Sequence, residues 1–512
     1  MRNQAIPMRI SKTFLLIYSM AMLGVSCKDR KEQKAVALFN SYCATCHIKP
    51  SIQSLPKDLW KNRVLPEMGA RLGLRDTAFN PYEGRSYRDQ EAMMRSGIYT
   101  LPPIIKHEDW ELLKDYIIGQ APDSVKMPPV KIAHDQLDGF LPQTITFDSL
   151  SGLMFTYLHI DSITQKIELG DMSGRLLTYD YPQRKLGFLN SFPRPITGLN
   201  RSQSAAYVTS VGKLNPSEIA SGSIFMEKAG TITELPLVLH RPVHTVVDDL
   251  NGDGRDELLV SEFGYLTGKL SLLKHNDSTY FERQVLSGLP GVIRSVIKDM
   301  NGDGKKDIVA LFSQGDENVT IYYQLEDLKF RMDKVIRFSP IYGSSWFELI
   351  DYDLDGDDDI ITVNGDNADQ TYIPKPYHGL RLHINDGNNQ FEEKYFYPMN
   401  GATRVVARDF DEDGDIDFGL LSTFPDYENP AEPSFIYLEN KNASAFTFEN
   451  STLKESNYGR WLLMDAGDVD GDGDEDIILS SFLYSFTPVP IEKIDLWREK
   501  GIDIMILENK LK

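Results

Sequence analysis

The chain has 512 residues, of which 41% are hydrophobic and 25% charged, and its 75 acidic against 54 basic residues give a formal net charge of −21. These values describe a globular protein with room for more than one domain, and they exclude disordered and fibrous chains. The acidic balance argues against a nucleic-acid partner, and the presence of only three cysteines excludes a scaffold built on disulfides.

The N-terminus has the pattern of a secretory signal, in which basic residues precede a short apolar run over residues 14–25. This run is shorter than the roughly 20 residues that span a bilayer. The segment Leu23-Gly24-Val25-Ser26-Cys27 resembles the lipobox of bacterial lipoproteins. The resemblance implies that residues 1–26 are a signal peptide and that Cys27 is lipidated. The protein would then be extracytoplasmic, anchored by lipid to the bacterial outer membrane on its periplasmic or surface side. The alternative is a plain signal peptide followed by a stray cysteine.

A C-x-x-C-H motif follows, formed by Cys43, Cys46 and His47. Two thiols at this spacing can reach the two vinyl groups on one porphyrin edge, and the histidine then lies under the iron as an axial ligand. A redox dithiol or half of a zinc site is the alternative. Against these, the chain has no second C-x-x-C, and residues 31–42 place apolar side chains on one helical face instead of forming a strand.

Residues 31–125 resemble the cytochrome c family, which has a helix before the haem motif and a last helix that packs across it. The last helix is expected over residues 107–118, where apolar side chains recur at helical spacing before Ala121-Pro122. The resemblance implies a small all-α domain with haem c attached covalently to Cys43 and Cys46 and ligated by His47.

The sixth iron ligand in that family is usually a methionine. Met68 is the preferred candidate, because Pro66 and Gly69 are expected to hold it in a rigid loop. Met93 and Met94 are the alternatives. A thioether ligand stabilises ferrous iron and raises the reduction potential, which suits electron transfer.

Residues 126–140 are interpreted as a linker stiffened by Pro128-Pro129. After it, five segments share the pattern D-x-[DN]-x-D-G-x-x-[DE], with starts 50, 52, 58 and 59 residues apart. The candidate metal ligands at positions one, three, five and nine of these acidic loops are Asp249, Asn251, Asp253, Glu257; Asp299, Asn301, Asp303, Asp307; Asp351, Asp353, Asp355, Asp359; Asp409, Asp411, Asp413, Asp417; and Asp468, Asp470, Asp472, Asp476.

The chemistry of these loops is that of calcium. Oxygen ligands at alternate positions converge on one cation when the chain curls, and glycine at position six permits the sharp turn. An EF-hand is excluded because its twelfth-position glutamate is missing and short apolar runs of strand character follow in place of a helix. We expect about five structural Ca²⁺ ions. The alternative is a set of solvated turns without metal.

The repeat resembles the FG-GAP/VCBS repeat of integrin-type β-propellers. In that family each loop joins the first two strands of a four-stranded blade and binds calcium. Residues 141–512 are long enough for seven blades of about 53 residues. Two blades without the acidic signature are expected at about 145–195 and 195–245. The expected fold is therefore a small all-α cytochrome c-like domain followed by an all-β, seven-bladed propeller.

A second site on the propeller is suggested by Asn364–Asp369 and Lys375–His378, which have no counterpart in the other repeats. A polar loop on a propeller face is a plausible place for ligand binding or docking, although an ordinary surface turn explains the composition equally well.

Three functions are compatible with the sequence. The first is an extracytoplasmic electron-transfer protein whose calcium-stabilised propeller binds a redox partner protein or a small-molecule or carbohydrate substrate. The second is an oxidoreductase with its active site on the propeller, passing electrons to the haem. The third is a carbohydrate-binding or adhesion propeller with an auxiliary haem. The sequence has no nucleophile elbow, H-E-x-x-H or phosphate-binding glycine loop, so a non-catalytic carrier is preferred.

Overall fold

The computed structural model describes residues 30–75, 79–129, 133, 137–147, 154–161, 163–275, 281–366, 373–428, 432–484 and 487–511. The chain divides into two compact units, one comprising residues 1–83 and 98–125 and the other comprising residues 84–97 and 126–512. The signal peptide predicted at 1–26 and the lipidation site predicted at Cys27 lie outside the described residues.

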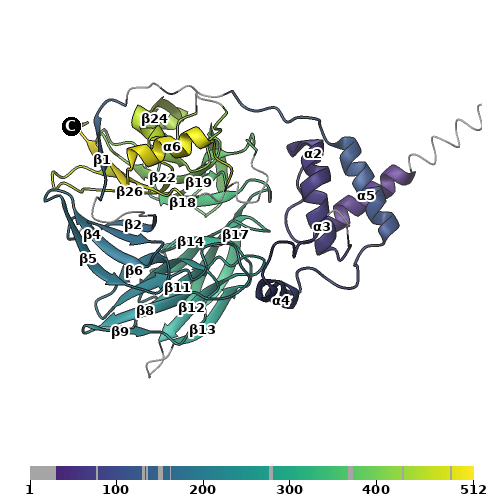
Figure 1. Ribbon diagram of the computed structural model, residues 1–512, viewed down its shortest axis with the longest axis horizontal. Coiled ribbons are helices and arrows are strands. Elements are labelled where there is room, and N and C mark those ends of the chain that lie inside the picture. The colour runs from purple at the N-terminus through teal and green to yellow at the C-terminus, as the bar shows by residue number, and fades with distance from the viewer. Residues whose placement is uncertain are drawn as a thin grey trace, which may run out of the picture. The chain divides into compact units, whose positions relative to one another are not determined.

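The first unit is helical (Figure 1). Residues 30–42 form its first helix. The elements that follow are η1 (Ile52–Ser54), α2 (Lys57–Leu59), the π-helical η2 (Trp60–Val64), α3 (Leu65–Arg71) and α5 (His107–Gln120). None of the helices in the described part of the chain has the length and apolar character needed to cross a bilayer.

Helix α5 is held in the unit by one apolar face. Trp110, Leu113 and Ile117 recur at helical spacing and are buried, and Glu108 and Asp109 in the first turn suit the positive end of the helix dipole. On α3, a Cβ at Gly69 would stand 3.0 Å from the Trp110 ring, so glycine permits the close approach of the two helices.

The rigid loop expected around Met68 is not present. Residues Leu65–Arg71 are helical, with Pro66 in the first turn. Proline is well tolerated there because a first-turn amide has no partner within the helix, so the proline begins the helix instead of excluding it.

The second unit contains α4 (Tyr87–Ser96) and, within the described residues, seven antiparallel sheets of four strands, which we number as blades 1 to 7 (Figure 1). Blades 1 to 3 are β2 (Phe155–Asp161), β3 (Lys166–Asp171), β4 (Arg175–Asp180), β5 (Lys185–Ser191); β6 (Ile196–Arg201), β7 (Ala206–Ser210), β8 (Ser223–Lys228), β9 (Thr231–Glu234); and β10 (Pro242–Asp248), β11 (Glu257–Glu262), β12 (Lys269–His275), β13 (Phe281–Ser287). Blades 4 to 6 are β14 (Val292–Lys298), β15 (Asp307–Phe312), β16 (Asn318–Glu326), β17 (Lys329–Arg337); β18 (Ser344–Ile350), β19 (Asp359–Asn364), β20 (Gly379–Asn385), β21 (Phe391–Pro398); and β22 (Ala402–Arg408), β23 (Asp417–Ser422), β24 (Phe435–Asn442), β25 (Thr447–Ser451).

Blade 7 joins the two ends of the propeller. It is built from β26 (Trp461–Gly467), β27 (Asp476–Ser481), β28 (Ile504–Asn509) and β1 (Phe140–Ile145). Strand β1, the first of the propeller, pairs with the last strand β28 in a register that sets Phe140 opposite Asn509. Helix α6 (Ile491–Lys500) lies between β27 and β28, and the short helices η3 (Ala443–Ala445) and η4 (Lys454–Asn457) flank β25. Because β1 completes the last sheet, the circle of blades is closed by strand pairing.

The first strand of each blade lies innermost. β2, β6, β10, β14, β18, β22 and β26 each contact the next, and β26 contacts β2, so these strands form a closed ring. The second strands of blades 3 to 7 are buried along their whole length. The continuous apolar runs of the sequence therefore mark strands covered on both faces by neighbouring blades.

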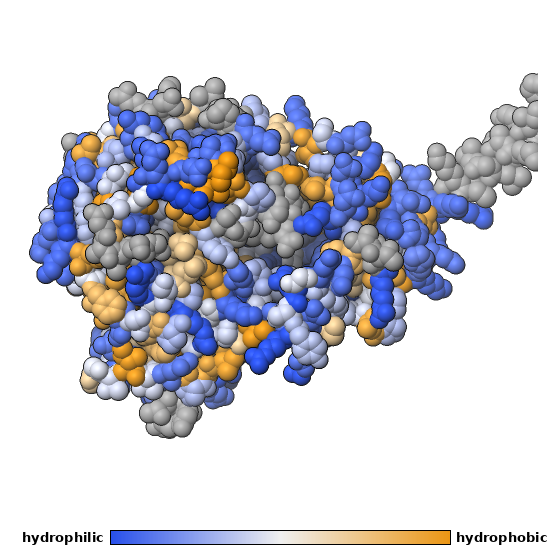
Figure 2. Space-filling view, viewed as in Figure 1, coloured by the Kyte–Doolittle hydropathy of each residue, from blue (hydrophilic) through white to orange (hydrophobic). Residues whose placement is uncertain are grey.

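The structure confirms a helical N-terminal region followed by a seven-bladed β-propeller. Each acidic loop joins the first and second strands of its blade, as the resemblance implies. The two blades without acidic loops are blades 1 and 2. On the face seen in Figure 2, hydrophilic residues are interspersed with small apolar areas.

Candidate metal and cofactor sites

The acidic loops owe their shape to their glycines and to their first aspartate. The sixth residue has a positive φ in all five loops, between 82° at Gly254 and 100° at Gly356, which is why glycine stands there. Its amide donates to the Oδ2 atom of the first aspartate in every loop, at 2.7 Å from Gly304 to Asp299 and at 3.2 Å from Gly473 to Asp468. Each loop therefore curls around its own first carboxylate.

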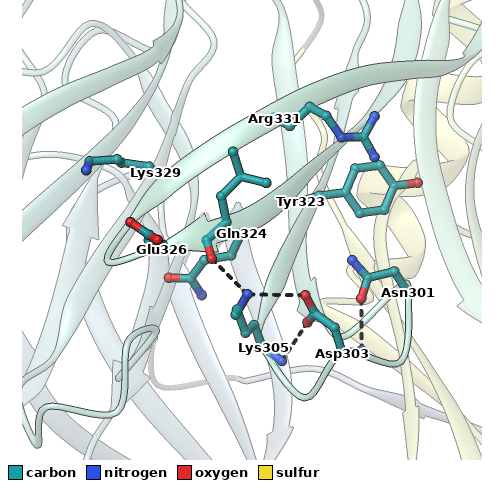
Figure 3. A pocket seen from close by; sticks show the side chains of 9 residues that line it. Asn301, Asp303, Lys305, Tyr323, Gln324, Glu326, Lys329 and Arg331 are labelled. Atoms are coloured by element: carbon teal, nitrogen blue, oxygen red, sulfur yellow. Dashed lines mark hydrogen bonds and ion pairs between the residues drawn. The ribbon is translucent and has the colours of Figure 1, made fainter.

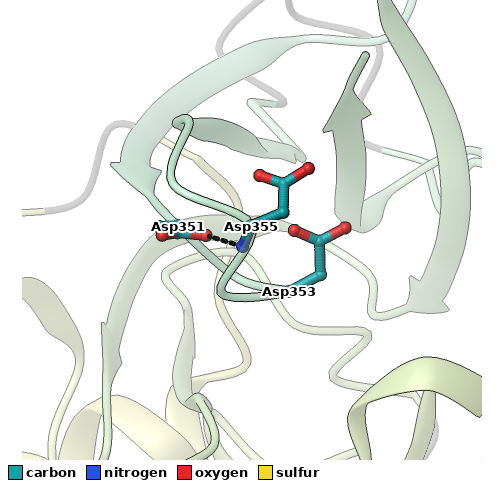
Figure 4. Close-up of side chains that lie close together, drawn as sticks. All are labelled: Asp351, Asp353 and Asp355. Atoms are coloured by element: carbon teal, nitrogen blue, oxygen red, sulfur yellow. Dashed lines mark hydrogen bonds between the residues drawn. The ribbon is translucent and has the colours of Figure 1, made fainter. Parts of the chain in front are cut away.

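Three of the loops bring carboxylates together at one point. In the triads Asp351, Asp353, Asp355; Asp409, Asp411, Asp413; and Asp468, Asp470, Asp476, one oxygen from each residue lies within 4.8 Å of the others. Figure 4 shows the three side chains of the first triad projecting from a single turn. Ligands on opposite sides of Ca²⁺ stand about 5 Å apart, since each Ca–O distance is about 2.3–2.6 Å. These triads therefore fit one calcium ion each.

The predicted ligands differ in placement from loop to loop. Asn251 and Asn301 occupy the third position in the first two loops, where the amide oxygen takes the place of a carboxylate. Asp476 belongs to the triad of the last loop, whereas Asp472 does not, and Asp359 and Asp417 lie outside the triads of their loops. Near the last loop, the Lys510 ammonium lies 3.6 Å from both Asp470 and Asp472.

The ninth residue of each loop is a buried hydrogen-bond acceptor. Asp307, the first residue of β15, has 0% of its surface exposed and accepts from the amides of Met300 at 3.0 Å and Gln324 at 2.7 Å. Asp359 and Asp476 accept equivalent pairs of amide bonds. In blades 4 to 7 the ninth carboxylate therefore ties the loop to the third strand of its own blade.

Burial raises the pKa of these ninth-position carboxyls. The pKa rises to about 7 for Glu257, Asp417 and Asp476 and to about 6 for Asp359, because the charged form loses its hydration and faces neighbouring acids. Hydrogen bonds from backbone amides oppose the shift in each case. A cation in the loop would favour the ionised form of the same groups.

Two features of the loops were not predicted from the sequence. The fourth residue also has a positive φ, and in two loops a non-glycine residue occupies it, Leu354 at 59° and Glu412 at 59°. In addition, amide side chains reach the second loop residue of the preceding blade: Gln324 donates to the Leu250 carbonyl at 3.0 Å, and Asn509 donates to the Phe410 carbonyl at 2.7 Å. A recurring Asn or Gln on the third strand was the available signal.

A cleft of about 390 Å³ lies beside the loop of blade 4. Figure 3 shows Asn301 and Asp303 on the loop side, and Tyr323 on β16 and Arg331 on β17. Lys305 bridges the two sides, because its ammonium donates to the Leu325 carbonyl at 2.8 Å. The cleft therefore borders the predicted metal site without containing all of its ligands.

In the helical unit, the C-x-x-C-H residues directly follow the first helix. The Cys43 amide donates to the Phe39 carbonyl at 3.0 Å, and the Cys43 side chain is half-buried while Cys46 is exposed. Burial raises the pKa of the Cys43 thiol to about 11, although Lys49 opposes the shift. His47 places Nδ1 2.8 Å from the Ile48 carbonyl oxygen. A carbonyl can only accept, so in the neutral ring Nδ1 carries the proton and Nε2 has the lone pair.

The methionine candidates lie in different units. Met68 is partly exposed on α3, in the same unit as His47. Met93, which is buried, and Met94, which is exposed, lie on α4 in the propeller unit. Within that unit α4 is fixed to blade 2, because Asp89 accepts hydrogen bonds from Ser217 and Lys213.

Lys375 and His378 are buried, with 2% and 1% of their surface exposed. Asn364, which begins the predicted polar loop, is also buried. It is the last residue of β19, and its side-chain amide donates to the Ser344 hydroxyl at 2.8 Å. The rest of that loop from Asn367 to Asp369 lies outside the described residues.

The comparison with family models agrees with the repeat. A family model described as "FG-GAP-like repeat" matches residues 299–362, which begin at the acidic loop of blade 4 and end in β19. Residues 299–362 are an FG-GAP-like repeat. No curated protein matches the chain. This FG-GAP-like repeat therefore covers the acidic loops of blades 4 and 5, and with it the Asp351 triad.

Three solved structures are similar to the chain at low identity. The β-propeller domain of Cps50 (Swd1) from Myceliophteria thermophila is 11% identical over 66% of this chain and 96% of its own, with a TM-score of 0.41. The WD40 domain of SCAP from fission yeast is 10% identical over 76% and 90%, with a TM-score of 0.36. The Pan2 WD40 domain from Neurospora crassa is 12% identical over 74% and 97%, with a TM-score of 0.42.

Proposed function

We propose that the protein is an extracytoplasmic c-type haem electron-transfer protein whose calcium-stabilised propeller binds a partner or substrate. The observation that carries the proposal is the state of His47 beside the two thiols. A metal-ligating histidine commonly donates its other ring N–H to a backbone carbonyl, and the Nδ1–H of His47 has that partner in Ile48. The Nε2 lone pair is thereby available for iron.

The state of Cys43 argues against a redox dithiol. Reactive dithiols have a lowered thiol pKa, whereas burial raises that of Cys43 to about 11. In the proposed protein Cys43 and Cys46 would hold haem c covalently, His47 would ligate its iron, and Met68 is the preferred candidate for the other ligand. When bound, the haem supplies an iron centre that exchanges one electron with a partner.

The test for haem is the reduced-minus-oxidised visible spectrum of protein matured in an oxidising compartment. We expect a haem that stays with the protein in acidified acetone and that is lost in Cys43→Ala and Cys46→Ala. Met68→Ala should shift the potential, whereas Met127→Ala should leave it unchanged. A colourless wild-type protein matured beside a functional c-type cytochrome would refute the proposal. Haem reduction that depends on an added substrate would favour the oxidoreductase alternative.

The lipid anchor is part of the same proposal and rests on the lipobox-like segment ending at Cys27. The wild-type protein should fractionate with membranes and incorporate labelled fatty acid. Cys27→Ser should release it in soluble form with its haem spectrum unchanged. Equal membrane association of both proteins would argue for a plain signal peptide.

Calcium is proposed for the five acidic loops, in a structural role. The three carboxylate triads support it, since each fits one cation and the third includes the buried Asp476. An ion in each loop would fix the corner between the first two strands of blades 3 to 7.

A further inference from the structure

The five acidic loops differ in charge. In their nine positions, the loops of blades 5, 6 and 7 each contain six acidic and no basic residues. The loop of blade 3 contains four acidic residues and one basic residue, Arg255, and the loop of blade 4 contains three acidic residues and two basic ones, Lys305 and Lys306. The same two loops have the neutral Asn251 and Asn301 at position three. Because the affinity of a loop for Ca²⁺ depends on the number of its charged ligands, the five loops are not equivalent.

The first aspartate of each loop differs in how many backbone amides donate to it. Asp299 of blade 4 accepts from four amides at 2.7–3.3 Å, and Asp249 of blade 3 accepts from three at 2.8–3.0 Å. Asp351 and Asp468 accept from two amides each, and Asp409 accepts from one. A carboxylate offers about four lone-pair positions. A cation that binds Asp299 therefore has to share or displace hydrogen bonds that the loop already makes.

The loop of blade 6 is in the opposite state. The Oδ1 atom of Asp409 is buried and has no hydrogen-bond partner among the described residues, and the same carboxylate belongs to the triad with Asp411 and Asp413. At the seventh position, Asp357 of blade 5 and Asp415 of blade 6 each keep a buried Oδ1 without a hydrogen-bond partner in the described part of the chain. A buried carboxylate oxygen without a partner is unfavourable, and a bound cation removes that penalty.

In blade 4 the seventh position holds a cation instead of an acid. The Lys305 ammonium lies 3.4 Å from Oδ2 of Asp303, the fifth residue of the same loop (Figure 3). Its neighbour Lys306 turns to the loop of blade 3, where its ammonium lies 2.8 Å from Asp248 and donates to the Asp249 carbonyl at 3.1 Å. An ion that enters either loop therefore meets an ammonium group that repels it.

Basic side chains also approach the loops of blades 5 and 7, but they come from outside those loops. The pairs are Lys298 with Asp358 in blade 5, and Arg408 with Glu475 and Lys510 with Asp470 and Asp472 in blade 7, at 2.6–3.6 Å. At most two of these basic side chains face the six acids of one loop. The loops of blades 5 to 7 therefore keep a larger negative charge than those of blades 3 and 4.

We propose that the calcium sites form two classes, in which the loops of blades 5 to 7 bind the ion about tenfold or more tightly than the loops of blades 3 and 4. Lys305 holds the site of blade 4 in the weak class by occupying the side of Asp303 that would face the ion. The inference rests on the proposed structural role of calcium. As the calcium concentration falls, the corners of blades 3 and 4 lose their ions first, while blades 5 to 7 stay loaded.

The test is a calcium titration of the full-length protein in competition with a chelating dye. We expect three ions to bind about tenfold or more tightly than the remaining two. Five equivalent sites, or any number of tight sites other than three, would refute the two classes while leaving the calcium role intact. No binding at millimolar calcium would refute both.

Three variants assign the classes to particular loops. Lys305→Asp, which gives blade 4 the seventh residue of blades 5 to 7, should tighten one weak site about tenfold. Lys228→Asp, the same change of charge on β8 of blade 2, should leave both weak sites unchanged. Asp411→Asn, which gives blade 6 the third residue of blades 3 and 4, should move one ion from the tight class to the weak class.

Lys305 and Lys228 are both exposed, so their variants should fold. Unchanged weak sites in Lys305→Asp would refute the role of that lysine. Three tight sites in Asp411→Asn would refute the dependence on charge at the third position.

Discussion

The guanidinium carbon of Arg294 lies 4.2 Å from the centroid of the Trp346 ring, and Arg404 approaches the same ring at 4.3 Å. The three residues belong to the inner strands of blades 4, 5 and 6, and each follows a register shift near the start of its strand. Glu348 pairs with Arg294 at 2.6 Å and accepts from the Trp346 indole N–H at 2.9 Å. One indole thus separates two like charges and links three blades.

Replacing that indole should destabilise the propeller. We expect Trp346→Ala to lower the free energy of unfolding by about 3–5 kcal/mol, because a large packed side chain is lost and two guanidinium groups lose their aromatic partner. Trp346→Phe should cost less, since a ring face remains and the losses are the N–H to Glu348 and part of the ring volume. Urea unfolding followed by circular dichroism measures both, and a loss below about 0.5 kcal/mol in Trp346→Ala would contradict the structural role.

Local patterns were enough to place much of the propeller. The acidic loop beginning at Asp299 and the apolar run that follows it predict β15. A short apolar run that directly follows a Gly-rich turn is typical of a buried strand. The same reasoning predicts the helix α5 from the spacing of its apolar residues. These elements are fixed by interactions between residues close together in the chain.

Features that depend on distant residues were not predictable in this way. Strand β1 pairs with β28, with Phe140 opposite Asn509. The sequence of residues 140–145 does not indicate which strand they pair with. The position of Asp307 in the repeat predicts a metal ligand. Its hydrogen bonds to the Met300 and Gln324 amides could be found only from the structure.

Removing calcium should lower the stability of the propeller. We expect about five Ca²⁺ per chain and a lower melting temperature in EGTA, since a site held at 100 times its Kd contributes about 2.7 kcal/mol. Asp353→Ala should bind one ion fewer and lose part of the calcium-dependent shift. Asp333→Ala, which removes a half-exposed acid outside the acidic loops, is the matched control. Metal analysis with thermal unfolding checks this, and equal calcium content in wild type and Asp353→Ala would count against the site.

The ninth acid of a loop should matter even without metal. Asp307→Ala leaves the amides of Met300 and Gln324 without their acceptor, which should cost about 1–3 kcal/mol for each buried group. Asp307→Asn keeps one carbonyl oxygen and should cost less. Asp303→Ala, at the exposed fifth position, should weaken only the calcium-loaded protein. Unfolding in calcium and in EGTA separates the hydrogen-bonding role from the metal-binding role. If Asp307→Ala lost stability only in the presence of calcium, Asp307 would be chiefly a metal ligand.

The buried carboxyl of Glu317 should make stability depend on pH. Glu317 is 2% exposed and accepts from the Ser344 amide at 2.8 Å and from the Gly343 amide at 3.2 Å. Burial raises its pKa from 4.5 to about 7, although these bonds and the charge of Lys375 oppose the shift. The folded state therefore binds the proton more tightly than the unfolded state, so the stabilisation present below pH 4.5 is lost as the pH rises through about 7.

Glu317→Gln removes this titration while keeping a carbonyl acceptor of similar size. Between pH 4.5 and pH 7.5 we expect the wild type to lose of order 3 kcal/mol relative to Glu317→Gln, since each pKa unit corresponds to about 1.4 kcal/mol. Contributions from the acidic loops cancel in the difference between the two proteins. Urea unfolding of both proteins across this pH range gives that difference, and parallel stability curves would show that the pKa of Glu317 is the same in the folded and unfolded chain.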